Sequence, residues 1–446
     1  MSNNEKQTNN ETRDSFTSKT GFILACIGSA VGMGNIWLFP YRVGQFGGAA
    51  FLIPYIIFIV LLGYTGLMGE FAFGRMTQTG PIGSFKKALE TKNKNWGGFL
   101  GIIPVIGAFG IAVGYAVVVG WFLRFLGGFI TGSAMSAADS GAYFGELASP
   151  FGSIIWHLLA LILVSIVLIS GISKGIETMN KIMMPAFYIL FVIVMVRVFM
   201  LDGAFEGIKY LVVPKWSSLM EPKTWIYALG QAFFSLSLAG SGMIVYGSYL
   251  KRDVDIMSSA KNTVIFDTLG AFLAGLVIIP AVFAFNLDPA SGPPLLFITI
   301  PSVFKLMPFG RLFGVIFFIS VLFASITSLM NLLEVPIEAV QSTFKLKRKL
   351  SVFIVVGAAF IFGLFAEDGN NLGVLMDFVS IYIIPIGAFI AAVMFFWVIG
   401  IEKAKCEIEC GTDKKLGKLF EISAKYVFVF LTIFVFIAGI LLGGIG

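Results

Sequence analysis

The stretch that decides the fold is "GSAVGMGNIWLFPYRVGQFGGAAF", residues 28–51. It begins inside an apolar run long enough to cross a membrane, yet it places Gly28, Gly32, Gly34 and the amide of Asn35 near the middle of that run. Glycine inside a helix costs about 1 kcal/mol relative to alanine, and a backbone group without a hydrogen bond in lipid costs several more. A break at this position must therefore face protein or a cavity instead of the bilayer.

The composition shows that such a bilayer surrounds the chain. Of 446 residues, 57% are hydrophobic and 13% are charged, and the mean hydropathy is +0.92, which one soluble core could not bury. An α-helix needs about 20 residues to cross a hydrocarbon core of about 30 Å. Eleven apolar runs satisfy this length, at residues 21–43, 49–73, 98–127, 152–171, 182–201, 225–248, 262–286, 312–342, 351–365, 373–400 and 423–444. None alternates in polarity as barrel strands do, so we predict an all-α polytopic membrane protein of about eleven transmembrane helices, with the lipid bilayer as a partner.

The distribution of basic residues predicts the orientation of these helices. If the N-terminus is cytoplasmic, the clusters at 86–94, 251–252, 345–349 and 403–418 lie inside, whereas outer loops carry far fewer Lys and Arg. With an odd number of helices, the C-terminus is then extracellular. The polar leader "MSNNEKQTNNETRDSF" has no cleavage pattern, so residues 1–15 are interpreted as a disordered cytoplasmic tail of a multi-pass protein of the cell inner (plasma) membrane.

Two classes of function are excluded by the residues present. The net charge of +6 comes from short clusters between apolar runs instead of a basic domain, which argues against a nucleic-acid partner. With His157 as its only histidine and no nucleophile motif around it, the chain does not look like an enzyme. Cys406 and Cys410 lie in a predicted cytoplasmic loop and are interpreted as ordinary thiols.

A second interrupted helix changes the interpretation of the first one. On Gly28 and Gly32 alone, close helix packing is the better explanation, because glycines four residues apart let helices approach. However, "GQAFFSLSLAGSGMIVYGSY", residues 230–249, again combines small residues and hydroxyls within a membrane helix. Two broken helices, one opening each half of a chain, are typical of transporters built from inverted repeats. The pair of breaks therefore favours a binding site.

Five ordered motifs carry a family resemblance. They are "GSAVGMGNIWLFPY" in helix 1, "GEFAFGR" in helix 2, Tyr115 six residues before Trp121 in helix 3, "QAFFSLSLAGSGMIVYGSYLKRD" in helix 6 and "ASITSLMNLLEVP" in helix 8. Over residues 13 to about 400 the chain resembles the neurotransmitter:sodium symporter family, and more narrowly a bacterial amino-acid transporter of the leucine-transporter fold. The resemblance implies a 5+5 inverted repeat, residues 16–201 and 225–400, with helices 1 and 6 unwound mid-membrane. An extracellular loop (202–224), a cytoplasmic loop (401–422) and a peripheral helix 11 (423–446) complete it.

The resemblance also implies one substrate site and two sodium sites. The substrate site would comprise Ala30, Gly32, Met33, Gly34, Ile111, Tyr115, Phe234, Ser235, Ser237, Gly240, Ser328 and Leu332. The first sodium site would use the carbonyl of Ala30, the side chains of Asn35, Ser235 and Asp267, and the substrate carboxylate. The second would use the carbonyls of Gly28, Val31 and Ala324 with the hydroxyls of Thr327 and Ser328.

Two positions indicate the substrate class. Family members that carry amines have an aspartate where this chain has Gly32, so an α-amino acid is expected here. Gly240 stands where relatives often have Met or Phe, and we interpret it as enlarging the pocket for a hydrophobic or aromatic side chain. Asp267 replaces the Asn of chloride-requiring members and Ala271 offers no hydroxyl, so chloride is not expected to be required.

The gates depart from the family pattern. Arg13, Phe16, Ser248 and Tyr249 match the inner gate, but Ser342 stands where Asp is usual, and Glu338 is a candidate replacement. At the outer gate Leu38 stands where Arg is usual, so Arg42 is expected to pair with Asp377.

The sequence therefore predicts a sodium-coupled symporter that imports an α-amino acid by alternating access. A proton-coupled transporter, with Glu70, Glu334 or Glu338 as carrier, and a non-transporting amino-acid sensor are the alternatives. A monomer and a homodimer both stay open.

Overall fold

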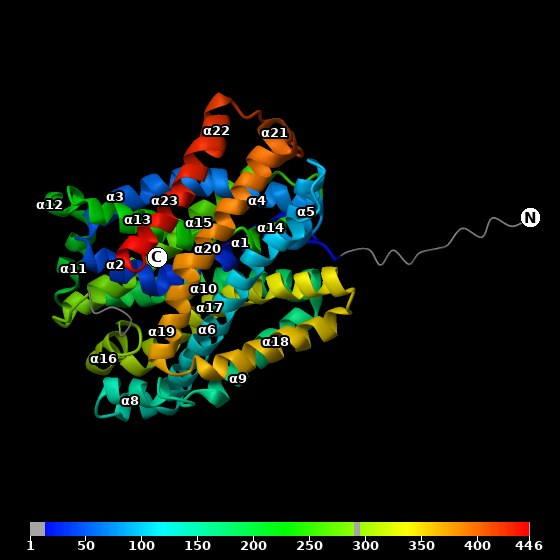
Figure 1. Ribbon diagram of the computed structural model, residues 1–446. Coiled ribbons are helices and arrows are strands. Elements are labelled where there is room, and N and C mark those ends of the chain that lie inside the picture. The colour runs from blue at the N-terminus through cyan, green and yellow to red at the C-terminus, as the bar shows by residue number, and fades with distance from the viewer. Residues whose placement is uncertain (1–13, 290–294, 446) are drawn as a thin grey trace, which may run out of the picture.

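The computed structural model describes residues 14–289 and 295–445, and all regular elements within these ranges are helices (Figure 1). The first half contains α1 (Lys19–Ala30), η1 (Gly34–Leu38), α2 (Phe39–Gln45), α3 (Ala49–Phe58), η2 (Ile59–Gly63), α4 (Tyr64–Thr77), α5 (Pro81–Glu90), α6 (Gly97–Thr131), α7 (Ser133–Ser136), α8 (Ser140–Leu147), α9 (Ile154–Ile169), η3 (Ile172–Glu177), α10 (Thr178–Phe199), α11 (Ala204–Val212) and α12 (Trp216–Leu219). The second half contains α13 (Pro222–Ser235), α14 (Gly242–Ser248), α15 (Ile256–Ala284), α16 (Thr299–Leu306), α17 (Gly310–Phe344), α18 (Arg348–Phe365), α19 (Gly369–Phe378), η5 (Val379–Ile383), α20 (Ile384–Val393), η6 (Met394–Gly400), α21 (Ile401–Ile408), α22 (Lys418–Ile422), η7 (Ser423–Phe428) and α23 (Val429–Leu442). The elements labelled η are π-helical segments, which widen the helix locally.

Eight helices in the described ranges are long and apolar enough to cross a membrane, and the bent pair Lys19–Ala30 and Gly34–Gln45 makes a ninth. The shorter apolar helix α9 and the interrupted pair α13 and α14 correspond to two further predicted runs. The prediction of a helical membrane protein is confirmed, and the number of eleven spans stays a prediction. Sequence analysis missed the short helices α7, α8, α11, α12 and α16, because each is far shorter than the span of about 20 residues that was searched for.

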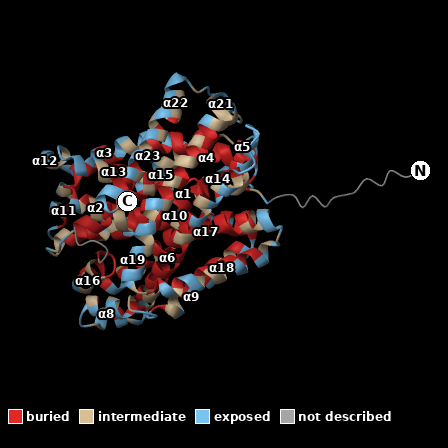
Figure 2. Cartoon of the chain, in the orientation of Figure 1, coloured by how far each residue is buried: buried red, intermediate tan, exposed pale blue. Residues whose placement is uncertain are grey.

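The bundle has a buried centre (Figure 2), and many large apolar side chains are exposed on its outer surface. α6 and α17 cross the middle and carry long rows of buried residues, whereas α8, α12 and α22 lie at the periphery and have few buried residues (Figures 1 and 2). On the outer faces, Ile155 is 77% exposed, Phe353 is 76% exposed and Leu441 is 76% exposed. So many large apolar side chains at high exposure form a surface that suits contact with lipid tails.

The first helix breaks at the predicted position. α1 begins after Ser18, whose hydroxyl accepts a hydrogen bond from the Gly21 amide, and it ends at Ala30 because Val31 takes an extended conformation with ψ 107°. The helical pair then bends by 51°. The Gly32 amide donates to Asn35 Oδ1 at 3.3 Å, so the broken backbone is partly satisfied by its own side chain.

The second break separates α13 from α14. Ser237 and Gly240 both adopt left-handed backbone angles, with φ 53° and φ 66°, and residues 236–241 separate the two helices. Glycine adopts this conformation at no steric cost, whereas another residue there is strained. Both broken helices are buried in protein, as the absence of water in a bilayer requires.

Candidate substrate and sodium sites

A cavity of about 70 Å³ lies where the two broken helices meet α6 and α17. Of the predicted substrate residues, the structure brings together Ala30, Gly32, Met33, Gly34, Ile111, Tyr115, Phe234, Ser237, Ser328 and Leu332 at its wall. Sequence reasoning missed Ser29, Phe233, Leu238, Ala239, Ser241, Gly242, Asn331 and Ile384, which also line it. The amide of Asn331, one residue before Leu332 in an apolar helix, was the one signal that could have identified part of this set.

One end of the cavity is polar because the broken backbone faces it. The Met33 amide donates to the Tyr115 hydroxyl at 2.8 Å. The Cβ of any residue at position 32 would collide with the Tyr115 hydroxyl and stand 3.0 Å from Ser328 Oγ. Position 32 therefore has no room for an aspartate, and the polar end is formed by backbone and hydroxyl groups.

The three side chains predicted for the first sodium site, those of Asn35, Ser235 and Asp267, form one buried network. Asn35 Nδ2 donates to Asp267 Oδ1 at 2.8 Å and to Ser235 Oγ at 3.1 Å, and Ser235 Oγ donates to Asp267 Oδ2 at 2.8 Å. Asn35 and Asp267 are completely buried. The Asp267 carboxylate thus points into the network beside the broken helix, and not outward to a helix end.

The residues predicted for the second sodium site lie at the contact between α1 and α17. A Cβ on Gly28 would stand 2.9 Å from Thr327 Cβ, so the two helices touch there. Thr327 Oγ1 donates to the carbonyls of Phe323 and Ala324, and Ser328 Oγ donates to Ser29 O at 3.2 Å. The hydroxyl hydrogens are therefore directed to backbone carbonyls, so these hydroxyls present oxygen and not hydrogen to any other partner.

Gly240 does not enlarge the cavity, so the prediction that it makes room for a large substrate side chain was wrong. Its side-chain direction points away from the cavity toward α20, where a Cβ would stand 2.5 Å from Gly387 O and 2.8 Å from Ala391 Cβ. The left-handed backbone of Gly240, which the sequence does not reveal, reverses the direction expected for a continuous helix.

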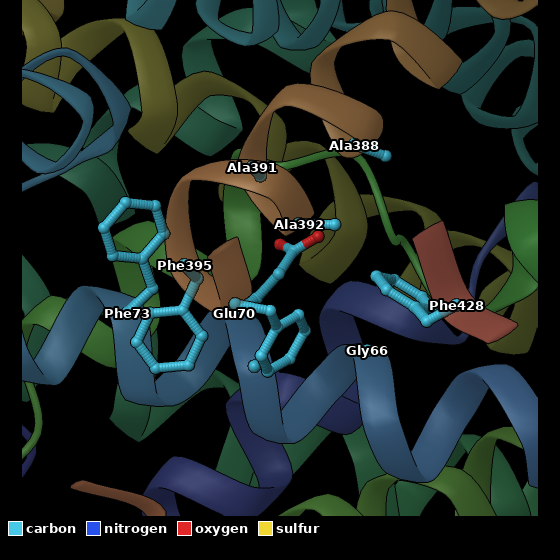
Figure 3. Close-up of a pocket in the computed structure, with 10 residues that line it drawn as sticks. Gly66, Glu70, Phe73, Ala388, Ala391, Ala392, Phe395 and Phe428 are labelled. Atoms are coloured by element: carbon cyan, nitrogen blue, oxygen red, sulfur yellow. The ribbon is translucent and has the colours of Figure 1, made fainter. Parts of the chain in front are cut away.

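Glu70, on α4, stabilises the unwound segment between α13 and α14. Its Oε1 accepts a hydrogen bond from the Gly240 amide at 2.8 Å, so α4 fixes the unwound segment. Figure 3 shows the Glu70 carboxylate beside Ala391 and Ala392, with the rings of Phe73, Phe395 and Phe428 around it. This carboxylate therefore has a positioning role.

The side of the bundle near Phe16 is closed by a chain of contacts. The Phe16 ring packs edge-on against Tyr246, and its amide donates to Tyr249 O. The Tyr249 hydroxyl donates to Glu334 Oε1 at 2.8 Å, and Arg348 Nη2 pairs with Glu334 Oε2 at 2.7 Å. Sequence reasoning missed Arg348, whose signal was its place at the start of a helix after a basic loop.

The remaining predicted gate residues are placed as follows. Arg13 lies outside the described residues. The Ser248 hydroxyl donates to Val245 O at 2.6 Å, and Glu338 accepts from Thr79 Oγ1 at 3.3 Å. Arg42 and Asp377 are not paired in this structure, since no ion pair joins them within the described ranges, and their gate role stays a prediction. The Arg42 guanidinium lies over the Tyr227 ring instead, 4.3 Å from its centroid.

Two interrupted membrane helices around a half-polar cavity, flanked by two oxygen-rich clusters, define a secondary transporter of the inverted-repeat class. The profile of the sodium:neurotransmitter symporter family matches residues 13–135 and 144–442. The chain belongs to this family, whose members are sodium-dependent transporters and not enzymes.

Individual relatives match over nearly the whole chain. The uncharacterized sodium-dependent transporter YhdH of Bacillus subtilis is 36% identical over 432 residues, which cover 93% of this chain and 94% of the relative. An uncharacterized sodium-dependent transporter of Methanocaldococcus jannaschii is 33% identical over 466 residues, covering 97% and 92%. The crystal structure of MhsT in complex with L-phenylalanine superposes with a TM-score of 0.87 at 34% identity, covering 96% of this chain and 100% of that one.

Proposed function

We propose that this protein is a sodium-coupled symporter that imports a hydrophobic or aromatic α-amino acid by alternating access. The cavity between the broken helices carries the proposal, because it joins a polar end made of backbone groups to an apolar wall. Such a cavity suits a zwitterion with an apolar side chain. The similarity to MhsT, whose crystal structure contains L-phenylalanine, supports the same substrate class.

Each part of the substrate has a proposed partner. The carboxylate meets the amides of Met33 and Gly34 and the Tyr115 hydroxyl, and the ammonium meets carbonyls near Ala30, Phe234 and Ser235. The side chain lies among Ile111, Ile384 and Leu332, where the wall is apolar. The absence of space for a side chain at position 32 supports an amino acid over an amine, because an amine lacking a carboxylate would need an acidic side chain there.

Two sodium ions are proposed to drive import. The first lies at the network of Asn35, Ser235 and Asp267 and contacts the substrate carboxylate, and the second lies between α1 and α17. One elementary charge crossing 100 mV releases about 2.3 kcal/mol, so one or two ions could concentrate a neutral zwitterion many-fold. The buried Asp267 carboxylate can itself balance the first ion, so we propose that chloride is not required.

We further propose that the N-terminus is cytoplasmic and the C-terminus extracellular in the cell inner membrane.

The function is tested by screening the twenty amino acids against the purified protein with a thermal-shift assay, in Na⁺ and in K⁺. Apolar and aromatic amino acids are expected to raise the melting temperature in Na⁺ and to have little effect in K⁺. An equal rise in both salts would contradict sodium coupling and favour proton coupling or simple sensing.

A further inference from the structure

Asn180 lies in the first turn of α10 and has one unsatisfied side-chain atom. The residue is completely buried. Its Nδ2 donates to Ile176 O at 2.8 Å, which fixes the orientation of the amide. Its Oδ1 is buried and has no hydrogen-bond partner among the described residues. A buried amide oxygen without a partner costs about 1–3 kcal/mol, so a ligand is expected to offset this cost.

The unsatisfied oxygen points at the second sodium site. A Cβ on Gly28 would collide with Asn180 Oδ1, and the same Cβ would stand 3.1 Å from Thr327 Oγ1. Gly28 and Thr327 are both among the residues proposed for that site. Three helices, α1, α10 and α17, therefore meet at one point, to which α10 brings Asn180 Oδ1 and α17 brings Thr327 Oγ1.

The chemistry of this point fits a cation better than a hydrogen bond. The hydroxyl hydrogen of Thr327 is directed to the carbonyls of its own helix, and that of Ser328 is directed to Ser29 O. The amide of Gly28 lies inside α1 and is engaged in that helix. Asn180 Oδ1 thus lies on the same face of Gly28 as the Thr327 hydroxyl, whose hydrogen is directed elsewhere, and no described residue donates to it. Uncharged carbonyl and hydroxyl oxygens are ligands that hard cations prefer.

We propose that Asn180 is a ligand of the second sodium ion, supplied by a third helix, α10. This inference rests on the proposed sodium coupling. It implies that the ion holds α1 to α10 as well as to α17. Loss of the ion would then loosen both contacts of α1, the helix that carries the substrate site.

The test compares Asn180→Leu, which keeps the volume and removes the oxygen, with Asn262→Leu. Asn262 is a matched control because its Nδ2 also donates to a carbonyl four residues earlier, Ser258 O at 2.8 Å, on α15 away from the site. The sodium concentration that half-saturates amino-acid binding is measured by scintillation proximity. Asn180→Leu is expected to raise it at least about tenfold, with unchanged substrate affinity at saturating sodium, whereas Asn262→Leu leaves it unchanged.

A second variant and the wild-type protein complete the test of Asn180. If Asn180→Leu does not fold, Asn180→Asp, which retains the oxygen and adds a charge, must lower the half-saturating sodium concentration. A wild-type value in either folded variant would overturn the inference and leave Asn180 as a packing residue. If the wild-type protein binds amino acid equally in Na⁺ and K⁺, the proposed function fails instead, so the two failures are distinguishable.

Discussion

Gly240 shows how one backbone angle decides what a residue does. Because its φ is 66° and a Cβ would meet Gly387 O at 2.5 Å, we predict that Gly240→Ala destabilises the fold by at least about 2 kcal/mol and does not change substrate preference. The melting temperature of the purified protein measures the effect. Gly357→Ala on α18 is the control, since no atom of the described residues lies within 4 Å of its Cβ position. Equal melting temperatures for the two variants would contradict this account.

Asp267 carries the prediction about chloride. Its carboxylate accepts hydrogen bonds from Asn35 and Ser235, beside the proposed first sodium ion. We expect wild-type uptake to be the same in chloride and in gluconate, and the double variant Asp267→Asn with Ala271→Ser to become chloride-dependent. The physical reason is that a neutral site needs an external anion to balance the ion. Sodium-driven uptake in the two salts is the measurement, and a collapse of wild-type uptake in gluconate would refute the prediction.

At the scale of elements, both helix breaks could be predicted from the sequence, because Gly28, Gly32 and Asn35 are costly inside a membrane helix. The cluster of Asn35, Ser235 and Asp267 followed from the family motifs. Side-chain directions could not be predicted where the backbone leaves the helix, which explains the error at Gly240. The surroundings of Arg42 could not be predicted either, because the Tyr227 ring under its guanidinium comes from a distant part of the chain.

Arg75, at the end of α4, joins segments that are distant in sequence. Its Nε donates to Glu407 at 2.6 Å and its Nη1 donates to Val254 O at 2.6 Å, so it ties α21 and the segment before α15 to α4. Arg75→Met would leave Glu407 and these carbonyls without a donor, and we expect a loss of about 3–5 kcal/mol. The melting temperature should fall by several degrees relative to Lys403→Met, an exposed change on α21. A fall no larger than that of the control would show that the contacts of Arg75 are not needed for stability.

At the scale of the whole molecule, the cysteines test the predicted orientation. Cys406 is exposed in the loop predicted to be cytoplasmic, whereas Cys26 is buried. In a Cys410→Ser background, a membrane-impermeant maleimide is expected to label Cys406 in inside-out vesicles and not in right-side-out vesicles. Cys406→Ser should abolish the signal. Labelling in right-side-out vesicles would reverse the assigned topology.

The central claim is that a sodium gradient drives an α-amino acid through the cavity between the broken helices. Its most direct test is uptake of radiolabelled phenylalanine into proteoliposomes that contain the purified protein, with an inward Na⁺ gradient or with K⁺ in its place. We expect concentrative, saturable uptake in Na⁺ and only equilibration in K⁺. Gly32→Ala should abolish uptake, because the added methyl group would collide with the Tyr115 hydroxyl. Uptake at the full rate in K⁺ would contradict the account.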